Sequence, residues 1–333
     1  MRHTKLLAAA MLFVSSLAAA AEPVSIVAAE NFYGDVAQQI GGPDVTVTSI
    51  LSSPDQDPHL FEASPATARQ LTGARIVISS GADYDPWVEK LLAAAKGQDR
   101  KEIVVADLAG KKSGDNPHLW YDPATIKALA RQLASDLAAV DPTHKVGYEQ
   151  REQAFVQSLQ SVDAKVGEMR KRYAGAPVTA SEPVFGYMAT ALGLNMRNEK
   201  FQLAVMNNAE PSVSDVAAFE SDLKQHKVRV MLFNAQADEP TVQRLVKLAR
   251  AEKIPVVAIT ETEPAGKTYQ AWMLAQLEAL DKALAGVTQL RRFPAKRSAS
   301  RWADATSSPW WTWPSRRASL SACSARMARA RPL

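Results

Sequence analysis

The chain has 333 residues with one cysteine and a formal net charge of +4 at pH 7, but the charge is unevenly distributed. Residues 287–333 hold ten of the 39 basic residues and a single acid, whereas residues 22–286 hold 27 basic and 34 acidic residues. An acidic body argues against nucleic acid as a partner, and a body without cysteine must be stabilised by its hydrophobic core rather than by disulfides.

Residues 1–21 have the pattern of a cleaved secretory signal peptide. Arg2 and Lys5 give a positive start, residues 6–17 form a short apolar run, and four alanines precede Glu22. The apolar run is shorter than the roughly 20 residues that a membrane-spanning helix needs. No cysteine lies at the cleavage site to carry a lipid, so we expect a periplasmic mature protein without a lipid anchor.

Residues 22–140 are predicted to form an N-terminal α/β lobe. Short apolar runs that are typical of buried strands alternate with helical patterns, which indicates a parallel sheet with helices on both faces. The strands are expected at residues 24–29, 45–51, 75–79 and 102–106. The helices are expected at residues 32–40, 65–71, 87–95 and 123–140.

A long polar helix is predicted over residues 141–175. Asp141 would cap this helix, and Pro142 would lie in its first turn. The apolar side chains form one narrow stripe, at residues 155, 159, 162, 166 and 169. We interpret this helix as a strut between two lobes, in preference to a coiled-coil arm.

Residues 176–286 are predicted to form a C-terminal α/β lobe of the same kind. Its strands are expected at residues 177–180, 203–206, 228–233 and 254–260. Its helices are expected at residues 184–192, 213–225, 240–253 and 269–284, with Gly286 as the stop. The fold class is therefore α/β, with two lobes that each hold a mainly parallel sheet and are joined by one long helix.

Residues 287–333 differ from the body in composition. They hold four of the seven tryptophans and the only cysteine, among Arg, Ser, Ala and Pro, without helix or strand periodicity. This composition is typical of GC-rich DNA translated in a shifted frame. The codons of residues 324–332, read from their third base, also permit G-P-N-G-A-G-K-T, the phosphate-binding loop of an ATPase. We expect a disordered, frameshifted tail rather than a functional basic one.

Two near-copies of a polar–Pro–His–Leu–aromatic phrase occur in the first lobe. They place His59 and His118, two of only five histidines, directly after prolines. Proline restricts both itself and the residue before it, so each imidazole is presented from a stiff loop. A neutral imidazole held in this way is a good metal ligand.

Two acidic residues lie at matching positions of the second lobe. Glu182 follows the strand at 177–180, and Glu261 follows the strand at 254–260. Ligands of open parallel sheets bind beyond the carboxyl ends of the strands, so these acids and the two histidines could converge in a cleft between the lobes. Glu263 is an alternative to Glu261, and Asp57 is a candidate outer partner.

These phrases resemble those of the periplasmic substrate-binding proteins of manganese and zinc ABC importers, a group that includes streptococcal surface antigens. The similarity covers residues 24–286 and rests on Ala28–Gly34, Asp57–His59, Asn116–Trp120, Ser181–Tyr187, Thr260–Gly266 and Tyr269–Met273. The resemblance implies four metal ligands at His59, His118, Glu182 and Glu261. It also implies a monomeric carrier whose partners are an inner-membrane permease and its ATPase.

The resemblance leaves the metal open. Zinc-type members usually carry a third histidine where Glu182 stands, and the last ligand is usually Asp, one methylene shorter than Glu261. The His-rich loop of many zinc-specific members is absent, since residues 91–116 contain no histidine. Two carboxylates make a harder site, which favours Mn²⁺ slightly, although Zn²⁺ binds most such sites more tightly. Either ion is therefore expected as the transported ligand.

Four protein ligands would close the coordination sphere and leave no position for an activated water. That arrangement predicts a carrier rather than an enzyme. Two alternatives stay open: a metal-dependent hydrolase that uses Glu182 or Glu261 as its general base, and an adhesin built on the same fold.

Overall fold

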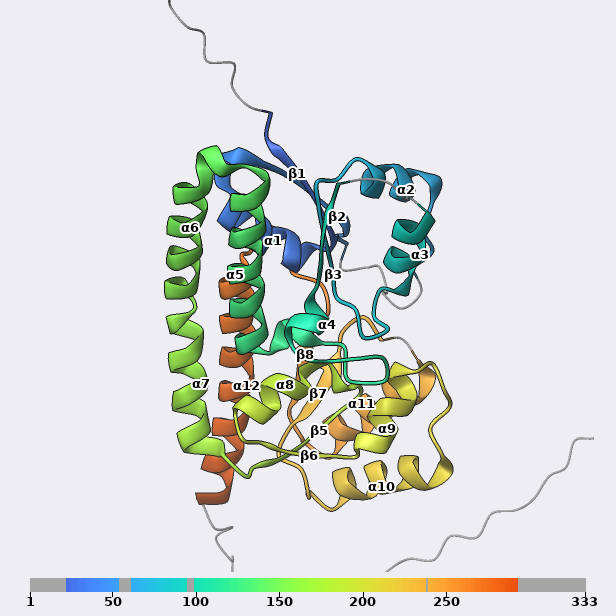
Figure 1. Ribbon diagram of the computed structural model, residues 1–333. Coiled ribbons are helices and arrows are strands. Elements are labelled where there is room, and N and C mark those ends of the chain that lie inside the picture. The colour runs from blue at the N-terminus through green and yellow to red at the C-terminus, as the bar shows by residue number, and fades with distance from the viewer. Residues whose placement is uncertain (1–21, 54–60, 95–98, 238, 293–333) are drawn as a thin grey trace, which may run out of the picture. The chain divides into compact units, whose positions relative to one another are not determined.

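The computed structural model describes residues 22–53, 61–94, 99–237 and 239–292 (Figure 1). The predicted signal peptide, His59, Asp57 and the tail from residue 293 lie outside the described residues. The described part forms a single compact unit that includes both predicted lobes. No helix of this part is long and apolar enough to span a membrane.

The first lobe contains a four-stranded parallel sheet. Its strands run in the order β2-β1-β3-β4, with bounds Val45–Leu51, Val24–Glu30, Ile76–Ser79 and Lys101–Val104. Its helices are α1 (Asn31–Gly41), α2 (Pro65–Thr72), α3 (Pro86–Ala94), α4 (Val105–Leu108) and α5 (Pro123–Val140). All four predicted strands are present in the first lobe.

Strand β1 shows why this sheet is covered on both faces. Ile26 and Ala28 belong to one buried cluster, which also contains residues of α1 and α5. Val27 and Ala29 belong to another cluster, with residues of α2 and α3. Successive side chains of a strand point to opposite faces, so helices on the two sides, visible in Figure 1, bury a strand that is apolar along most of its length.

The predicted strut is present as two consecutive helices rather than one. After a short 3₁₀ turn (Pro142–His144), α6 (Lys145–Ser158) and α7 (Gln160–Tyr173) follow one another along one side of the molecule (Figure 1). The Ser158 hydroxyl donates to the Phe155 carbonyl at 2.6 Å, and the Leu159 amide donates to the same carbonyl at 3.3 Å. The Ser158 hydroxyl competes with the backbone amide for this carbonyl and weakens the helical hydrogen bonding, which explains the break at Leu159.

The second lobe contains the other parallel sheet. Its strands run in the order β6-β5-β7-β8, with bounds Asn195–Arg197, Pro177–Ala180, Met231–Asn234 and Val256–Ile259. Its helices are α8 (Gly186–Ala191), α9 (Glu199–Met206), α10 (Val213–Lys224), α11 (Pro240–Ala251) and α12 (Tyr269–Arg292). Short 3₁₀ helices Leu119–Tyr121 and Pro183–Phe185 follow His118 and Glu182.

Two predictions for the second lobe are wrong in detail. Residues 203–206 belong to α9, where Phe201 and Val205 are buried at helical i,i+4 spacing and Leu203 is exposed; the fourth strand is β6. A short apolar run does not by itself distinguish a strand from a buried helical turn. The last helix does not stop at Gly286 but continues to Arg292, since one glycine inside a helix costs only about 1 kcal/mol.

Candidate metal centre

His118 is presented from the loop between α4 and the 3₁₀ turn Leu119–Tyr121, and its side chain is fully buried. The His118 Nδ1 atom lies 2.6 Å from the Oδ1 atom of Asn116, and the His118 amide donates to the same oxygen at 3.1 Å. An amide oxygen accepts, so Nδ1 carries the hydrogen and the Nε2 lone pair is directed elsewhere. Nε2 lies 3.5 Å from Glu261 Oε2.

Asn116 is itself held by the second lobe. Its Nδ2 atom donates to the Pro183 carbonyl at 2.8 Å, and the Tyr187 hydroxyl donates to the Asn116 carbonyl at 2.6 Å. The orientation of the His118 imidazole therefore depends on residues that follow Glu182 in the second sheet's first loop.

Glu182 and Glu261 are brought together by a residue that the sequence reasoning missed. Asn234, the last residue of β7, donates from Nδ2 to Glu182 Oε1 at 2.9 Å and to Glu261 Oε1 at 2.6 Å. Asn234, Glu182 and Glu261 are all buried. The strand-end rule that selected the two glutamates applies equally to Asn234, which ends a buried strand, so the rule could have identified it.

Tyr84 is a second missed contact. Its hydroxyl donates to Glu261 Oε2 at 2.9 Å, on the oxygen that faces His118. Burial and the charge of Glu261 raise the pKa of Tyr84 well above its usual value, so the phenol remains a donor. No signal in the sequence distinguished this tyrosine from the other six.

Two buried acidic residues of the first lobe, Glu30 and Asp85, lie close to each other. Asp85 accepts from the Ser80 and Gly81 amides at 2.6 and 2.8 Å, and burial raises its pKa to about 6. Burial and the charge of Asp85 raise the pKa of Glu30, at the end of β1, well above its usual value.

Glu263, the alternative to Glu261, lies elsewhere. Its backbone is held by Asn31 at the start of α1, through bonds of 3.1 Å to the Glu263 amide and 2.8 Å to its carbonyl. Burial and the charge of Asp35 raise the pKa of the Glu263 carboxyl to about 9. It is Glu261 whose carboxylate reaches His118, while Glu263 lies against α1 through the bonds of its backbone to Asn31.

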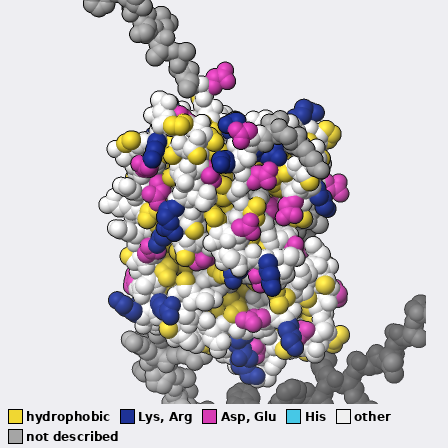
Figure 2. All heavy atoms as spheres, in the orientation of Figure 1, with side chains coloured by type: hydrophobic (Ala, Val, Ile, Leu, Met, Phe, Trp, Pro, Cys, Tyr) yellow, Lys and Arg dark blue, Asp and Glu magenta, His cyan; other side chains and the backbone are white. Residues whose placement is uncertain are grey.

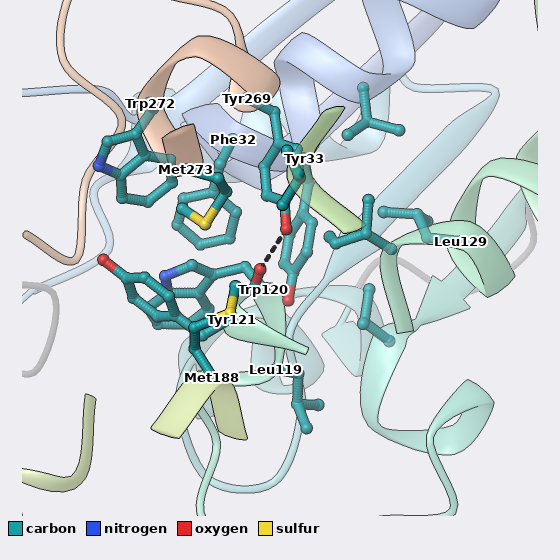
Figure 3. Close-up of a cluster of buried hydrophobic side chains, with 14 of the residues drawn as sticks. Phe32, Tyr33, Leu119, Trp120, Tyr121, Leu129, Met188, Tyr269, Trp272 and Met273 are labelled. Atoms are coloured by element: carbon teal, nitrogen blue, oxygen red, sulfur yellow. Dashed lines mark hydrogen bonds between the residues drawn. The ribbon is translucent and has the colours of Figure 1, made fainter. Parts of the chain in front are cut away.

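A cluster of buried aromatic rings packs against His118. Trp120 packs at 5.2 Å from His118 and 4.4 Å from Phe32, measured between ring centroids. The Tyr269 hydroxyl donates to the Trp120 carbonyl at 2.6 Å, the dashed line in Figure 3. These rings come from α1, the 3₁₀ turn after His118 and α12, so both lobes support the loop that carries the imidazole.

The described residues do not form a complete metal site. Among them no group of three or more His, Cys, Asp or Glu is arranged to hold an ion. The direct contact is between His118 and Glu261, and Glu182 joins them through Asn234. The fourth predicted ligand, His59, lies outside the described residues, in the segment that follows β2.

Residues 26–283 match the family described as zinc-uptake complex component A, periplasmic. The chain belongs to this family. The predicted family resemblance is thereby confirmed, and the family's description places its members outside the cytoplasm.

Curated relatives of this family member include proteins named for both metals. The manganese ABC transporter substrate-binding lipoprotein PsaA of Streptococcus mitis is 23% identical over 289 residues, which cover 80% of this chain and 91% of the relative. The zinc-binding lipoprotein AdcA of Streptococcus pneumoniae is 24% identical over 271 residues. That match covers 73% of this chain but only 52% of AdcA, so the chain spans about half of that protein.

Solved structures share the architecture. The periplasmic zinc binding protein TroA from Treponema pallidum aligns with a TM-score of 0.68 at 18% identity, covering 79% of this chain and 99% of TroA. The Cd-bound periplasmic metal binding protein from Candidatus Liberibacter asiaticus aligns with a TM-score of 0.63 at 17% identity, covering 78% of this chain and 99% of that protein. These similarities confirm the predicted two-lobe α/β fold.

Proposed function

We propose that this protein captures Mn²⁺ or Zn²⁺ outside the cytoplasm and delivers the ion to an ABC importer, composed of a membrane permease and its ATPase. The observation that carries the proposal is the buried contact between His118 and Glu261, to which Asn234 ties Glu182. Membership of the zinc-uptake family and relatives named for manganese and zinc support it.

The proposed ligands are His59, His118, Glu182 and Glu261. Imidazole nitrogen and carboxylate oxygen are ligands that both ions accept, and two carboxylates balance the charge of a divalent cation. Two of these side chains lie close together in the described part, where His118 Nε2 is 3.5 Å from Glu261 Oε2.

The family consists of transport components and not of enzymes, which confirms the prediction that this chain is not an enzyme. The hydrolase and adhesin alternatives are not favoured. On the face in Figure 2, acidic and basic side chains are interspersed, which agrees with a partner other than nucleic acid.

Several finer features remain part of the proposal: the lobe boundaries at residues 140, 175 and 286, a monomeric state, and removal of residues 1–21. The named relatives are lipoproteins, so membrane attachment should be measured directly. Intact mass and fractionation of the protein from its native host would identify the mature N-terminus and any lipid. Light scattering during size-exclusion chromatography would give the mass in solution.

The metal proposal is tested by equilibrium dialysis of the purified mature protein with Mn²⁺ and with Zn²⁺, followed by elemental analysis. One ion per chain is expected, with affinity greatly reduced in His118→Ala and Glu261→Gln. His226→Ala serves as the control, because that histidine is 57% exposed and pairs with Glu252. Absence of stoichiometric binding, or hydrolytic turnover lost in Glu182→Gln with the metal retained, would contradict the proposal.

A further inference from the structure

The turn between β3 and α3 has an unusual backbone. Gly81, Ala82 and Asp83 are consecutive, and their φ angles are all positive, at 73°, 50° and 67°. Glycine adopts this conformation readily, whereas the side chains of Ala82 and Asp83 disfavour it. On one side the turn is held by Asp85, which accepts from the Gly81 amide at 2.8 Å. A strained turn persists only where surrounding contacts hold it, so its other contacts indicate what it is for.

Asp83 bonds to residues 111–116, the segment that precedes the Pro-His pair of the first lobe and that we call the clip loop. Its Oδ2 atom accepts from the Ser113 hydroxyl at 2.6 Å and from the Gly114 amide at 2.9 Å. Both donors belong to the clip loop, and a single oxygen of Asp83 engages them. The strained turn therefore fastens the clip loop to the first lobe.

The second lobe holds the other end of the clip loop. The Tyr187 hydroxyl donates to the Asn116 carbonyl at 2.6 Å, and Asn116 Nδ2 donates to the Pro183 carbonyl at 2.8 Å. The Lys111 ammonium lies 5.3 Å from the centroid of the Tyr187 ring, within the range of a cation–π contact. The clip loop is thus attached to both lobes, and it ends at the residue that orients His118.

We propose that the clip loop holds the His118 imidazole in its metal-binding orientation, and that Asp83 is the positioning residue that fixes this loop to the first lobe. The inference rests on the proposed function, because it takes His118 as a metal ligand. Asn116 Oδ1 lies 2.6 Å from His118 Nδ1 and 3.1 Å from the His118 amide nitrogen, so a shift of the clip loop at Asn116 turns the ring. The partner that fixes the orientation of a ligating imidazole also sets its affinity for the ion.

The first test separates the bonds of Asp83 from the conformation of its backbone. Asp83→Gly removes the acceptor oxygen but suits the left-handed backbone, whereas Asp83→Asn keeps an acceptor oxygen and tolerates the same φ. In Asp83→Gly we expect the Zn²⁺ and Mn²⁺ dissociation constants of the mature protein to rise by about three- to tenfold, which is less than the effect of direct outer partners of metal ligands. Asp83→Asn should bind both ions as the unaltered protein does. Asn208→Gly is the control, since Asn208 is an exposed residue of the second lobe with a φ of 51°.

The hydrogen on His118 Nδ1 reports the orientation of the ring without any ion. In metal-free protein that carries isotope-labelled histidine, its NMR signal can be assigned with His118→Gln. This hydrogen should exchange slowly with water, because the His118 side chain is fully buried and Nδ1 is bonded to Asn116. Asp83→Gly should speed the exchange by about the same factor as it weakens metal binding. Ser113→Ala, an exposed change outside the strained turn, should act in the same direction with a smaller effect, and it serves if Asp83→Gly does not fold.

A purely structural role of Asp83 would lower the unfolding free energy but leave the metal dissociation constants and the exchange of this hydrogen unchanged in the folded variant. That result would overturn the inference. An equal loss of affinity in Asp83→Asn and Asp83→Gly would also overturn it, because the charge of Asp83 and not its bonds to the clip loop would then be responsible. If the unaltered protein binds neither Zn²⁺ nor Mn²⁺, the proposed function fails, while the exchange measurement still shows whether the clip loop holds His118.

Discussion

Replacing Glu263 by Gln should stabilise the metal-free protein at neutral pH. Burial and Asp35 raise the pKa of Glu263 to about 9, and its Oε2 atom has no hydrogen-bond partner among the described residues. In the unfolded chain a glutamate titrates near pH 4.3, so at pH 7 folding must load a proton at a cost of about 4 kcal/mol. The glutamine amide needs a partner, which removes about 1 kcal/mol of that gain and leaves about 3 kcal/mol.

The sign of the pH dependence follows from the raised pKa. The folded state binds the proton more tightly, so the contribution of Glu263 is full below about pH 4 and is lost as the pH rises towards 9. Urea unfolding, followed by circular dichroism at several pH values from 5 to 8.5, measures this effect. The unfolding free energy of the unaltered protein should fall as the pH rises, and it should fall less steeply in Glu263→Gln. Glu278→Gln, an exposed change on α12, is the control. Equal slopes in the Glu263→Gln variant and the unaltered protein would show that Glu263 is ionised in the fold.

Three further predictions concern the strut and the tail. Asp281→Ala should lower the unfolding free energy by about 1–3 kcal/mol, because Asp281 accepts from Lys165 at 2.5 Å and from Tyr173 at 2.7 Å. Glu168→Ala is the control, and it should cost under about 1 kcal/mol because Glu168 pairs with Arg172 at the exposed surface of α7. Small-angle scattering should show little change in radius of gyration on metal binding, and a large compaction would contradict the strut reasoning. Truncation after Arg292 should leave metal affinity and unfolding unchanged, and resequencing codons 280–333 would show whether the frame is intact.

Most of the first lobe could be predicted because the helices and strands that its local sequence favours are the ones that its tertiary packing requires. Strand β2 has the predicted bounds, Val45–Leu51, and α5 likewise has the predicted bounds, Pro123–Val140. Helix α5 begins after Asp122, whose side chain accepts from the Ala124 amide at 3.2 Å, and it carries Pro123 in its first turn. Capping and periodicity are local, so a single sequence reveals them.

The departures arise where tertiary contacts decide. The four residues 203–206 are compatible with a strand or a helical turn, and burial of Phe201 against Phe219, with ring centroids 4.9 Å apart, selects the helix. The break at Leu159 depends on a serine rotamer that no periodicity reveals. Asn234 and Tyr84 each contact Glu261 from elements 27 and 177 residues away, and a single sequence carries no record of such pairings.

The orientation of His118 links the site to the expected small motion between the lobes. Asn116 accepts from His118 Nδ1 and donates to the Pro183 carbonyl, while Tyr187 donates to the Asn116 carbonyl. A wide rotation of the second lobe would break the latter two bonds and release the imidazole that the ion needs. These polar bonds are only part-buried, so they alone do not prevent rotation. The packing of α7 against α12 through Asp281 also opposes a wide rotation, because it ties the connecting helix to the second lobe.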